Sequence, residues 1–220
     1  MELFLDSSNP KEIREVTSWG LITGVTTNLT LISQPGSDKW AVLQEVLDAS
    51  PGPVMVQVVG WHEPRTMIEQ AKRLHSYSER IIVKIPMSVG GIQALLALKG
   101  EVPELRITMT AVSSVAQAYL CAKAGADIAA LFNGPFDLVS DTPVDLVAPV
   151  RRIFDNYGFN TKILACGRFP RLFGEFAAAG ADMCTMKFEY MRMLYEHPFT
   201  ESRMNGFLRD WQARFGDETW

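Results

Sequence analysis

The sequence has few of the side chains that bind metals or form disulfides. Among its 220 residues there are three cysteines and three histidines, all well separated along the chain: Cys121, Cys166, Cys184, His62, His75 and His197. An odd number of widely spaced cysteines has neither the paired pattern of a zinc site nor the even count of a disulfide framework. We therefore expect free thiols, no metal ion, no cofactor and a cytoplasmic protein.

The sequence also lacks long apolar runs and clusters of basic residues. No stretch is long enough to cross a bilayer, and residues 1–6 do not have the form of a signal peptide. The net charge is −4 and the positive charges are dispersed, so neither a membrane nor a nucleic acid is expected as a partner. With 47% hydrophobic and 21% charged residues, the chain is expected to form one globular domain over residues 1–220.

Short apolar runs alternate with helical patterns from one end of the chain to the other. The runs predict strands at 2–6, 21–25, 53–59, 80–86, 104–110, 128–132, 162–166 and 182–186. Eight such β/α units are the number that closes a (β/α)8 TIM barrel, an α/β fold. The alternative is an open doubly wound sheet, which more often has a glycine-rich loop after its first strand; no such loop is present.

An additional helix is predicted at the C-terminus, over about residues 199–216. Apolar residues fall at helical spacing on one face of it: Met204, Phe207, Leu208, Trp211 and Phe215. Such a face either caps its own barrel or docks on a neighbouring subunit, and the residues alone favour the first.

The fourth predicted strand contains a lysine within an apolar run. Lys84 lies between Val83 and Ile85, close to the C-terminal end of the strand. In a barrel this end faces the active site. A lysine removed from water loses its proton more easily, and its neutral amine can form a Schiff base with a carbonyl group. The alternative is a lysine whose amine simply reaches solvent at the strand tip.

Other polar or aromatic residues lie at the ends of the predicted strands. They are Asp6, Thr26, Asn28, Gln57, Thr110, Phe132, Cys166 and Arg168. Each has a structural explanation: Asp6 and Asn28 could cap helices, Gln57 could satisfy a buried backbone group, and Thr110 suits any strand. Because strand ends of a barrel meet at one mouth, we expect these side chains to gather around Lys84.

Several motifs, spread over the whole chain, resemble one known family. They are MELFLD at 1–6, GVTTN at 24–28, VKIP at 83–86, TAV at 110–112, AGA at 124–126 and DWQARFG at 210–216. In this order they resemble the small transaldolases and fructose-6-phosphate aldolases, which are metal-independent class I aldolases. The resemblance implies a small sugar or sugar-phosphate substrate and a ring-based homo-oligomer, often a decamer, in which the terminal helix reaches a neighbouring subunit.

The resemblance also implies roles for individual residues. Lys84 would form the Schiff base, and Asp6 would be the acid/base for carbon–carbon cleavage. Thr26 and Asn28 would bind hydroxyl groups of the donor. Gln57 and Thr110 would hold a water molecule that moves protons, and no cofactor would be needed.

The sequence departs from the family pattern where the substrate phosphate is bound. The aromatic residue Phe132 is present, but Pro135 stands in place of the usual arginine. After the seventh strand a Ser-aromatic-basic segment is replaced by Cys166-Gly167-Arg168. We expect Arg168 to take over from the missing arginine, because its planar guanidinium suits a phosphate or sulfonate.

Reaction type and substrate stay open at this point. Gln57 and Ala130 resemble the aldolases of the family, whereas Phe132 resembles the transaldolases. A specialised substrate, such as a sulfonated, deoxy or biosynthetic sugar, is one alternative. A non-catalytic paralogue and another lysine-dependent lyase, such as a deoxyribose-phosphate-type aldolase, are the others.

Overall fold

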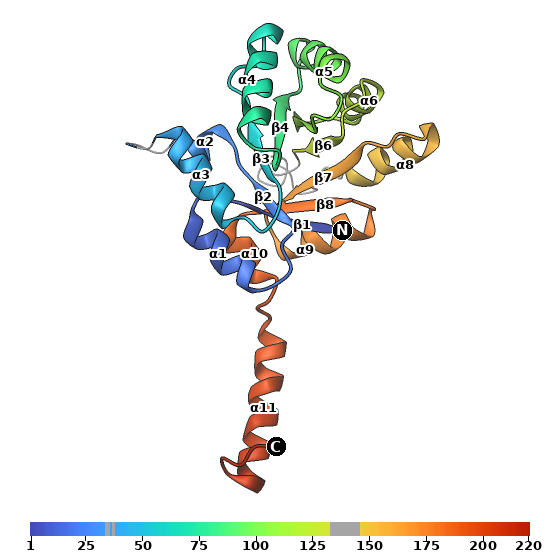
Figure 1. The fold of residues 1–220 in the computed structure, drawn as a ribbon. Helices are drawn as coiled ribbons and strands as arrows, with labels where there is room; N and C mark the ends of the chain where they lie inside the picture. The colour runs from blue at the N-terminus through green and yellow to red at the C-terminus, as the bar shows by residue number, and fades with distance from the viewer. Residues whose placement is uncertain (34–35, 37, 133–145) are drawn as a thin grey trace.

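A computed structural model describes the chain except for residues 34–35, 37 and 133–145, and its eight parallel strands close a barrel in sequence order (Figure 1). The strands are β1 Glu2–Asp6, β2 Gly24–Thr26, β3 Val54–Gln57, β4 Ile81–Pro86, β5 Ile107–Val112, β6 Ile128–Leu131, β7 Lys162–Gly167 and β8 Met183–Met186. The predicted (β/α)8 barrel is confirmed, because β8 pairs with β1 as well as with β7.

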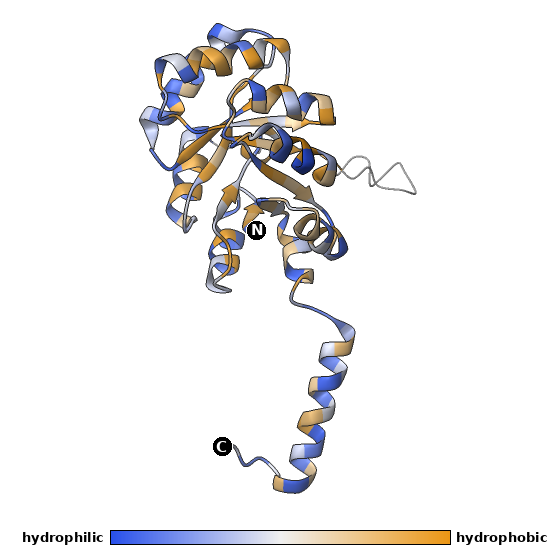
Figure 2. Ribbon diagram, turned by 90° about the vertical axis from the view of Figure 1, so that its right-hand side faces the viewer, coloured by the Kyte–Doolittle hydropathy of each residue, from blue (hydrophilic) through white to orange (hydrophobic). Residues whose placement is uncertain are grey.

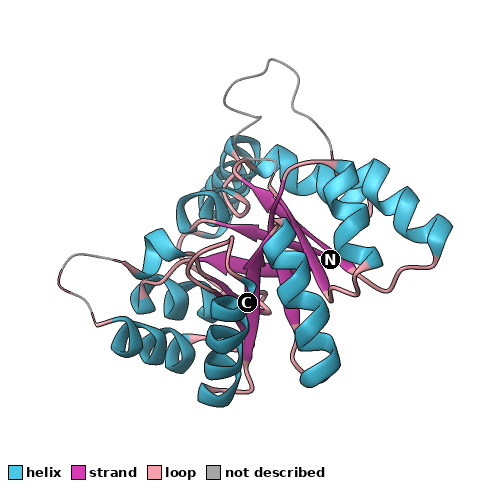
Figure 3. Cartoon of the chain, turned by 90° about the horizontal axis from the view of Figure 1, so that it is seen from above, coloured by secondary structure: helices cyan, strands magenta, loops and turns pink. Residues whose placement is uncertain are grey.

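Helices surround this barrel on its outer face (Figure 3). In the described part of the chain those around the barrel are α1 Pro10–Ser18, α2 Leu29–Ile32, α3 Lys39–Ala49, α4 Pro64–Tyr77, α5 Val89–Glu101, α6 Val115–Lys123, α8 Val147–Tyr157, α9 Pro170–Ala178 and α10 Phe188–Met193, and they are followed by α11 Pro198–Phe215. Helix α6 ends where predicted, since Gly125 has a φ of 85° that ends a helix without steric cost.

All predicted strands except the first have bounds that differ from those in the structure, and the second and fifth differ most at their first residue. The second begins at Gly24, later than predicted. The fifth begins at Ile107 because the amide of Leu105 donates to the carbonyl of Val102, which makes residues 102–105 a turn. The fifth strand also runs two residues further than predicted, to Val112.

A β-bulge lies at the C-terminal end of β5. The pairing with β6 shifts between Met109 and Val112, and Ala111 has a φ of 59°. A bulge adds one residue to a strand and changes the direction of its side chains. Here Thr110 and Ala111 both line the same cavity, which consecutive residues of a regular strand cannot do.

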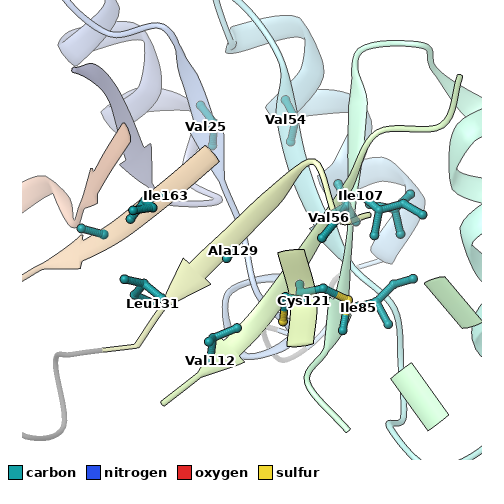
Figure 4. Packing of buried hydrophobic residues seen from close by; sticks show 14 of the residues in the cluster. Val25, Val54, Val56, Ile85, Ile107, Val112, Cys121, Ala129, Leu131 and Ile163 are labelled. Atoms are coloured by element: carbon teal, nitrogen blue, oxygen red, sulfur yellow. The ribbon is translucent and has the colours of Figure 1, made fainter. Parts of the chain in front are cut away.

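The barrel has two apolar layers, one on each face of the sheet. The inner layer fills the interior and consists of Phe4, Met55, Ile82, Ile128, Ala130, Leu164 and Met183. The outer layer lies between the strands and the helices and includes Val25, Val54, Ile107, Ala129 and Ile163 (Figure 4). Because strand side chains alternate, the strands β1, β3, β4, β6, β7 and β8 supply residues to both layers.

Helix α11 extends away from the barrel (Figure 1). It begins at Pro198, where the ring Nδ1 of His197 accepts a hydrogen bond from the amide of Phe199 at 3.2 Å. None of its residues is buried, and hydrophobic and hydrophilic residues both occur along it (Figure 2). The helix was predicted, but the expectation that it caps its own barrel is wrong.

No helix in the described ranges has the length and apolar character required to span a membrane.

Candidate active site

A cavity of about 630 Å³ opens at the C-terminal ends of the strands. Its wall includes every residue singled out at the strand ends: Asp6, Thr26, Asn28, Gln57, Lys84, Thr110, Phe132, Cys166 and Arg168. The structure therefore brings together side chains that are up to 162 positions apart in the chain. Their convergence was expected from barrel geometry alone.

The same alternation that builds the inner apolar layer points these residues into the cavity. Asp6 lies two positions after Phe4, Lys84 two positions after Ile82, and Cys166 two positions after Leu164. Side chains two positions apart on a strand share a face. The apolar inner layer thus forms the floor of a polar site and keeps water from reaching it from below.

Lys84 is almost entirely removed from solvent, with 7% of its surface exposed. Its ammonium Nζ donates a hydrogen bond to the carbonyl of Thr27 at 2.8 Å. Burial lowers the pKa of Lys84, because the charged form loses its hydration, while Asp6 and Cys166 act weakly in the opposite direction. The neutral, nucleophilic amine is therefore more available than that of an exposed lysine.

Asp6 is held by a chain of two threonines. The Thr26 hydroxyl donates to Oδ1 of Asp6 at 2.8 Å and lies 2.7 Å from the Thr185 hydroxyl. A hydroxyl has one proton, so Thr185 must be the donor to Thr26. Burial raises the pKa of Asp6, although Lys84, Thr26 and Lys187 each oppose this. The carboxyl group is thus prepared to accept a proton.

Asp6 does not cap a helix, so the alternative role that the sequence left open for it is excluded. The cap of α1 is Asn9, whose side chain accepts from the amide of Lys11 at 3.0 Å. The explanation does hold for Asn28, because its Oδ1 caps α2 by accepting from the amide of Leu31 at 3.0 Å. Asn28 also lines the cavity, and the cap leaves its amide NH2 able to donate.

Gln57 lies beside Lys84, with which it pairs across β3 and β4. Its side chain makes no hydrogen bond to a backbone group in the part of the chain that the structure describes, so the structural explanation does not apply. Thr110 pairs with Pro86 on the other side of β4. An amide and a hydroxyl therefore flank the strand that carries the lysine, at the level where a water molecule could bind both.

The comparisons with known proteins agree with this geometry. The family model described as transaldolase/fructose-6-phosphate aldolase matches residues 3–218. The chain belongs to this family. It is 39% identical to a probable transaldolase of Aquifex aeolicus, over 96% of this chain and 97% of that protein. It is also 36% identical to a probable transaldolase of Symbiobacterium thermophilum, over 98% and 99% of the two chains.

In this member of the transaldolase/fructose-6-phosphate aldolase family, Cys166 and Arg168 line the cavity from the end of β7. Burial raises the pKa of the Cys166 thiol to about 11, so it is uncharged at neutral pH. Arg168 is half-buried and has no hydrogen bond or ion pair with another described residue. Arg171 instead pairs with Glu175 at 2.7 Å on the surface. Pro135 lies outside the described residues.

Among the lining residues that were not predicted from the sequence, four have polar side chains: Thr30, Thr185, Lys187 and Tyr190. The signal was available, since Thr185 and Lys187 lie at the end of the eighth apolar run. Within the described ranges, no three His, Cys, Asp or Glu residues are placed together as a metal site.

Proposed function

We propose that this protein is a class I aldolase of its family, which forms a Schiff base between Lys84 and a ketose donor and moves or releases a dihydroxyacetone unit. The observation that carries the proposal is a buried lysine with a lowered pKa in the same cavity as a carboxyl group held by Thr26. Burial of an amine away from water is the usual means of making lysine nucleophilic at neutral pH.

In the first step the neutral Lys84 amine attacks the ketose carbonyl carbon. The carbinolamine then loses water and becomes an iminium ion. A water molecule held between Gln57 and Thr110 would transfer the protons that this dehydration requires, because an amide cannot itself exchange protons at neutral pH.

In the second step Asp6 takes the proton from the hydroxyl group next to the bond that breaks. The oxygen becomes the aldehyde of the first product, and the electron pair of the carbon–carbon bond moves into the iminium ion to give an enamine. Thr26 supports this role because it donates to Oδ1 only, leaving Oδ2 of Asp6 for the substrate. The enamine then attacks an acceptor aldehyde or is protonated and hydrolysed from Lys84.

Transfer to an acceptor and free cleavage remain the two candidate outcomes of this chemistry. The names of the relatives favour transfer, since each is a probable transaldolase. Gln57 and Ala130, which both line the cavity, favour free cleavage by their resemblance to the aldolases. Measuring product release from fructose 6-phosphate with and without erythrose 4-phosphate separates the two: transfer requires the acceptor, whereas free cleavage does not.

The decisive experiment is reductive trapping of the Schiff base. The protein is treated with borohydride and fructose 6-phosphate, dihydroxyacetone or sedoheptulose 7-phosphate, and the peptide that contains Ile81–Pro86 is analysed by mass spectrometry. We expect the adduct on Lys84 and none in a Lys84→Met variant. An adduct on another lysine would contradict the assignment, and no adduct with any donor would favour a non-catalytic paralogue.

A further inference from the structure

Two buried threonines meet across the strand that carries Asp6. Thr26 lies on β2 and Thr185 on β8, the strands that flank β1 on its two sides. Thr26 pairs with Asp6 itself, and Thr185 pairs with Phe4, which lies on the same face of β1 as Asp6. The two hydroxyl oxygens are 2.7 Å apart, and Thr185 is only 6% exposed. The support of Asp6 therefore extends to the eighth strand as well as to the second.

The two hydrogen bonds run in one direction, from Thr185 toward Asp6. A carboxylate can only accept, so Thr26 directs its single hydroxyl proton to Oδ1 of Asp6 at 2.8 Å. Thr26 can then only accept from Thr185, whose side chain makes no other hydrogen bond with a described residue. While Thr185 donates to Thr26, the Thr26 proton stays directed at the carboxylate.

The direction of this chain matters for proton transfer. A hydroxyl group that accepts a hydrogen bond becomes a stronger donor, so Thr185 strengthens the bond from Thr26 to Oδ1. When Oδ2 of Asp6 takes a proton from the substrate, Oδ1 becomes the carbonyl oxygen of a neutral acid and still accepts from Thr26. The chain is thus preserved during the step and keeps the carboxyl group in one orientation.

Three titratable side chains also surround the carboxyl group: Lys84 on β4, Cys166 on β7 and Lys187 after β8. Burial raises the pKa of Asp6, whereas the two lysines and the hydrogen bond from Thr26 lower it. Burial also raises the pKa of the Cys166 thiol to about 11, so this group is uncharged at neutral pH. Replacing Thr185 leaves all three side chains in place, and a change at Asp6 then reports the loss of the hydroxyl group.

We propose that Thr185 is a positioning residue for the acid/base of this site. Acting through Thr26, it holds Oδ1 of Asp6 so that Oδ2 remains turned toward the substrate, and it favours the ionised carboxyl group that can take a proton. The inference rests on the proposed function, because it concerns the step in which Asp6 takes a proton during carbon–carbon cleavage.

Thr185→Val tests this role, because valine has nearly the shape of threonine and no hydroxyl group. With fructose 6-phosphate we expect kcat for cleavage to fall roughly 3- to 10-fold, the range for a lost neutral hydrogen bond. KM should change by less than about twofold, and the fraction of Lys84 trapped by borohydride should not fall. Thr185→Ser, which restores the hydroxyl group, should return kcat to within about twofold of wild type.

A double-mutant cycle distinguishes positioning from a general loosening of the barrel. In the Asp6→Asn background the carboxylate is absent, so Thr185→Val should slow cleavage by less than about a further twofold. Thr161→Val is the matched control. Thr161 is 4% exposed, donates to the carbonyl of Ala126 at 2.7 Å and precedes β7 at the opposite end of the barrel. Its replacement should leave kcat unchanged, even if chemical denaturation shows a lower stability.

Infrared difference spectroscopy follows the ionisation of Asp6 without turnover. The pH-dependent carboxylate signal of Asp6 is assigned by its absence in Asp6→Asn. The pKa of Asp6 should be higher in Thr185→Val than in wild type, because a hydrogen bond that favours the charged form has been weakened. In Thr185→Ser and Thr161→Val it should equal that of wild type.

The proposal is overturned if cleavage by Thr185→Val stays within about twofold of wild type, if Thr185→Ser is equally slow, or if Asp6 titrates at an unchanged pH. Equal losses from Thr185→Val in the presence and absence of the Asp6 carboxylate would also contradict it. If Thr185→Val does not fold, Thr185→Ala takes its place, with Thr185→Ser again as the variant that restores the hydroxyl group.

The measurements also separate this inference from the proposed function. If the titration of Asp6 depends on Thr185 but Lys84 forms no adduct, the positioning role stands and the Schiff-base function fails. If Lys84 is trapped by dihydroxyacetone but neither cleavage nor the titration of Asp6 depends on Thr185, the function stands and the positioning role fails.

Discussion

Burial shifts the pKa values of Lys84 and Asp6 in opposite directions. It lowers the pKa of the lysine and raises that of the carboxyl group, because each loses hydration of its charged form. Each pKa therefore moves toward neutral pH, where a group that gains or loses a proton during the reaction is most effective. The apolar inner layer keeps water from reaching both side chains from below the cavity.

Replacing Asp6 by asparagine tests the role of the carboxylate. We expect Asp6→Asn to retain Schiff-base formation and to slow carbon–carbon cleavage by roughly 10²–10⁴, the usual contribution of a positioned acid/base. Borohydride trapping measures the first step and aldehyde release the second. Cleavage within a few-fold of wild type would mean that Asp6 has only a structural role.

The lowered pKa of Lys84 predicts an altered pH dependence of its reactivity. The neutral amine should appear at a lower pH than in an ordinary lysine, whose pKa is 10.5. Competition labelling with acetic anhydride, with an N-acetyl-lysine amide as reference, measures this midpoint. Because the Asp6 charge raises the pKa of Lys84, Asp6→Asn should move the midpoint still lower. A midpoint equal to that of the reference would contradict a desolvated lysine.

At the scale of the elements, strand β2 depends on a glycine at its first position, Gly24. An added Cβ at Gly24 would lie 2.3 Å from the carbonyl oxygen of Pro53 and 2.9 Å from the Phe4 ring. The first of these is a backbone atom of the neighbouring chain segment and cannot rotate away. The close approach of β2 to its neighbours therefore depends on glycine, and Thr26 follows two residues later on the same face.

We expect Gly24→Ala to lower the free energy of unfolding by about 2 kcal/mol or more, as overpacking of a close contact does. Chemical denaturation measures the loss. Gly100→Ala is the control, because nothing lies within 4 Å of the added Cβ near the end of α5, and alanine there should stabilise by about 0.5–1 kcal/mol. Equal effects of the two substitutions would show that the contact at Gly24 is relieved without cost.

At the scale of the whole molecule, the exposed apolar residues of α11 are the main unexplained feature. Phe199 is 81% exposed, and Met204, Phe207 and Leu208 are each more than half exposed. Apolar residues that extend into water do not stabilise the helix. They would be buried if the helix packed on another surface.

We predict a ring-based homo-oligomer in which α11 packs against a neighbouring subunit. Light scattering at micromolar concentration should give a multiple of the 24.5 kDa chain mass. Phe207→Glu should reduce that mass, while Arg209→Glu, which adds charge on the same helix without removing apolar surface, should reduce it less. A 24.5 kDa monomer for the wild type would refute the prediction.

The barrel and most of the cavity wall could be predicted from the sequence because both follow from local rules. The rule that the strand ends of a barrel meet at one mouth placed Asp6, Gln57 and Thr110 near Lys84, and the order of strands and helices indicated closure. Neither rule requires knowledge of distant contacts. The purely structural roles that the sequence leaves open for Asp6 and Gln57 are excluded by their neighbours in the folded chain, since Asn9 caps α1 in place of Asp6.

Tertiary structure decided what depends on contacts between distant segments. The hydrogen bond between Thr185 and Thr26, which supports Asp6, joins residues 159 positions apart and forms because β8 closes on β1. The placement of Lys187 beside Arg168 follows from the register of β7 and β8. The direction in which α11 leaves the barrel was likewise not encoded in its own helical pattern. Burial, register and helix direction arise from the whole chain, so no local pattern of residues predicts them.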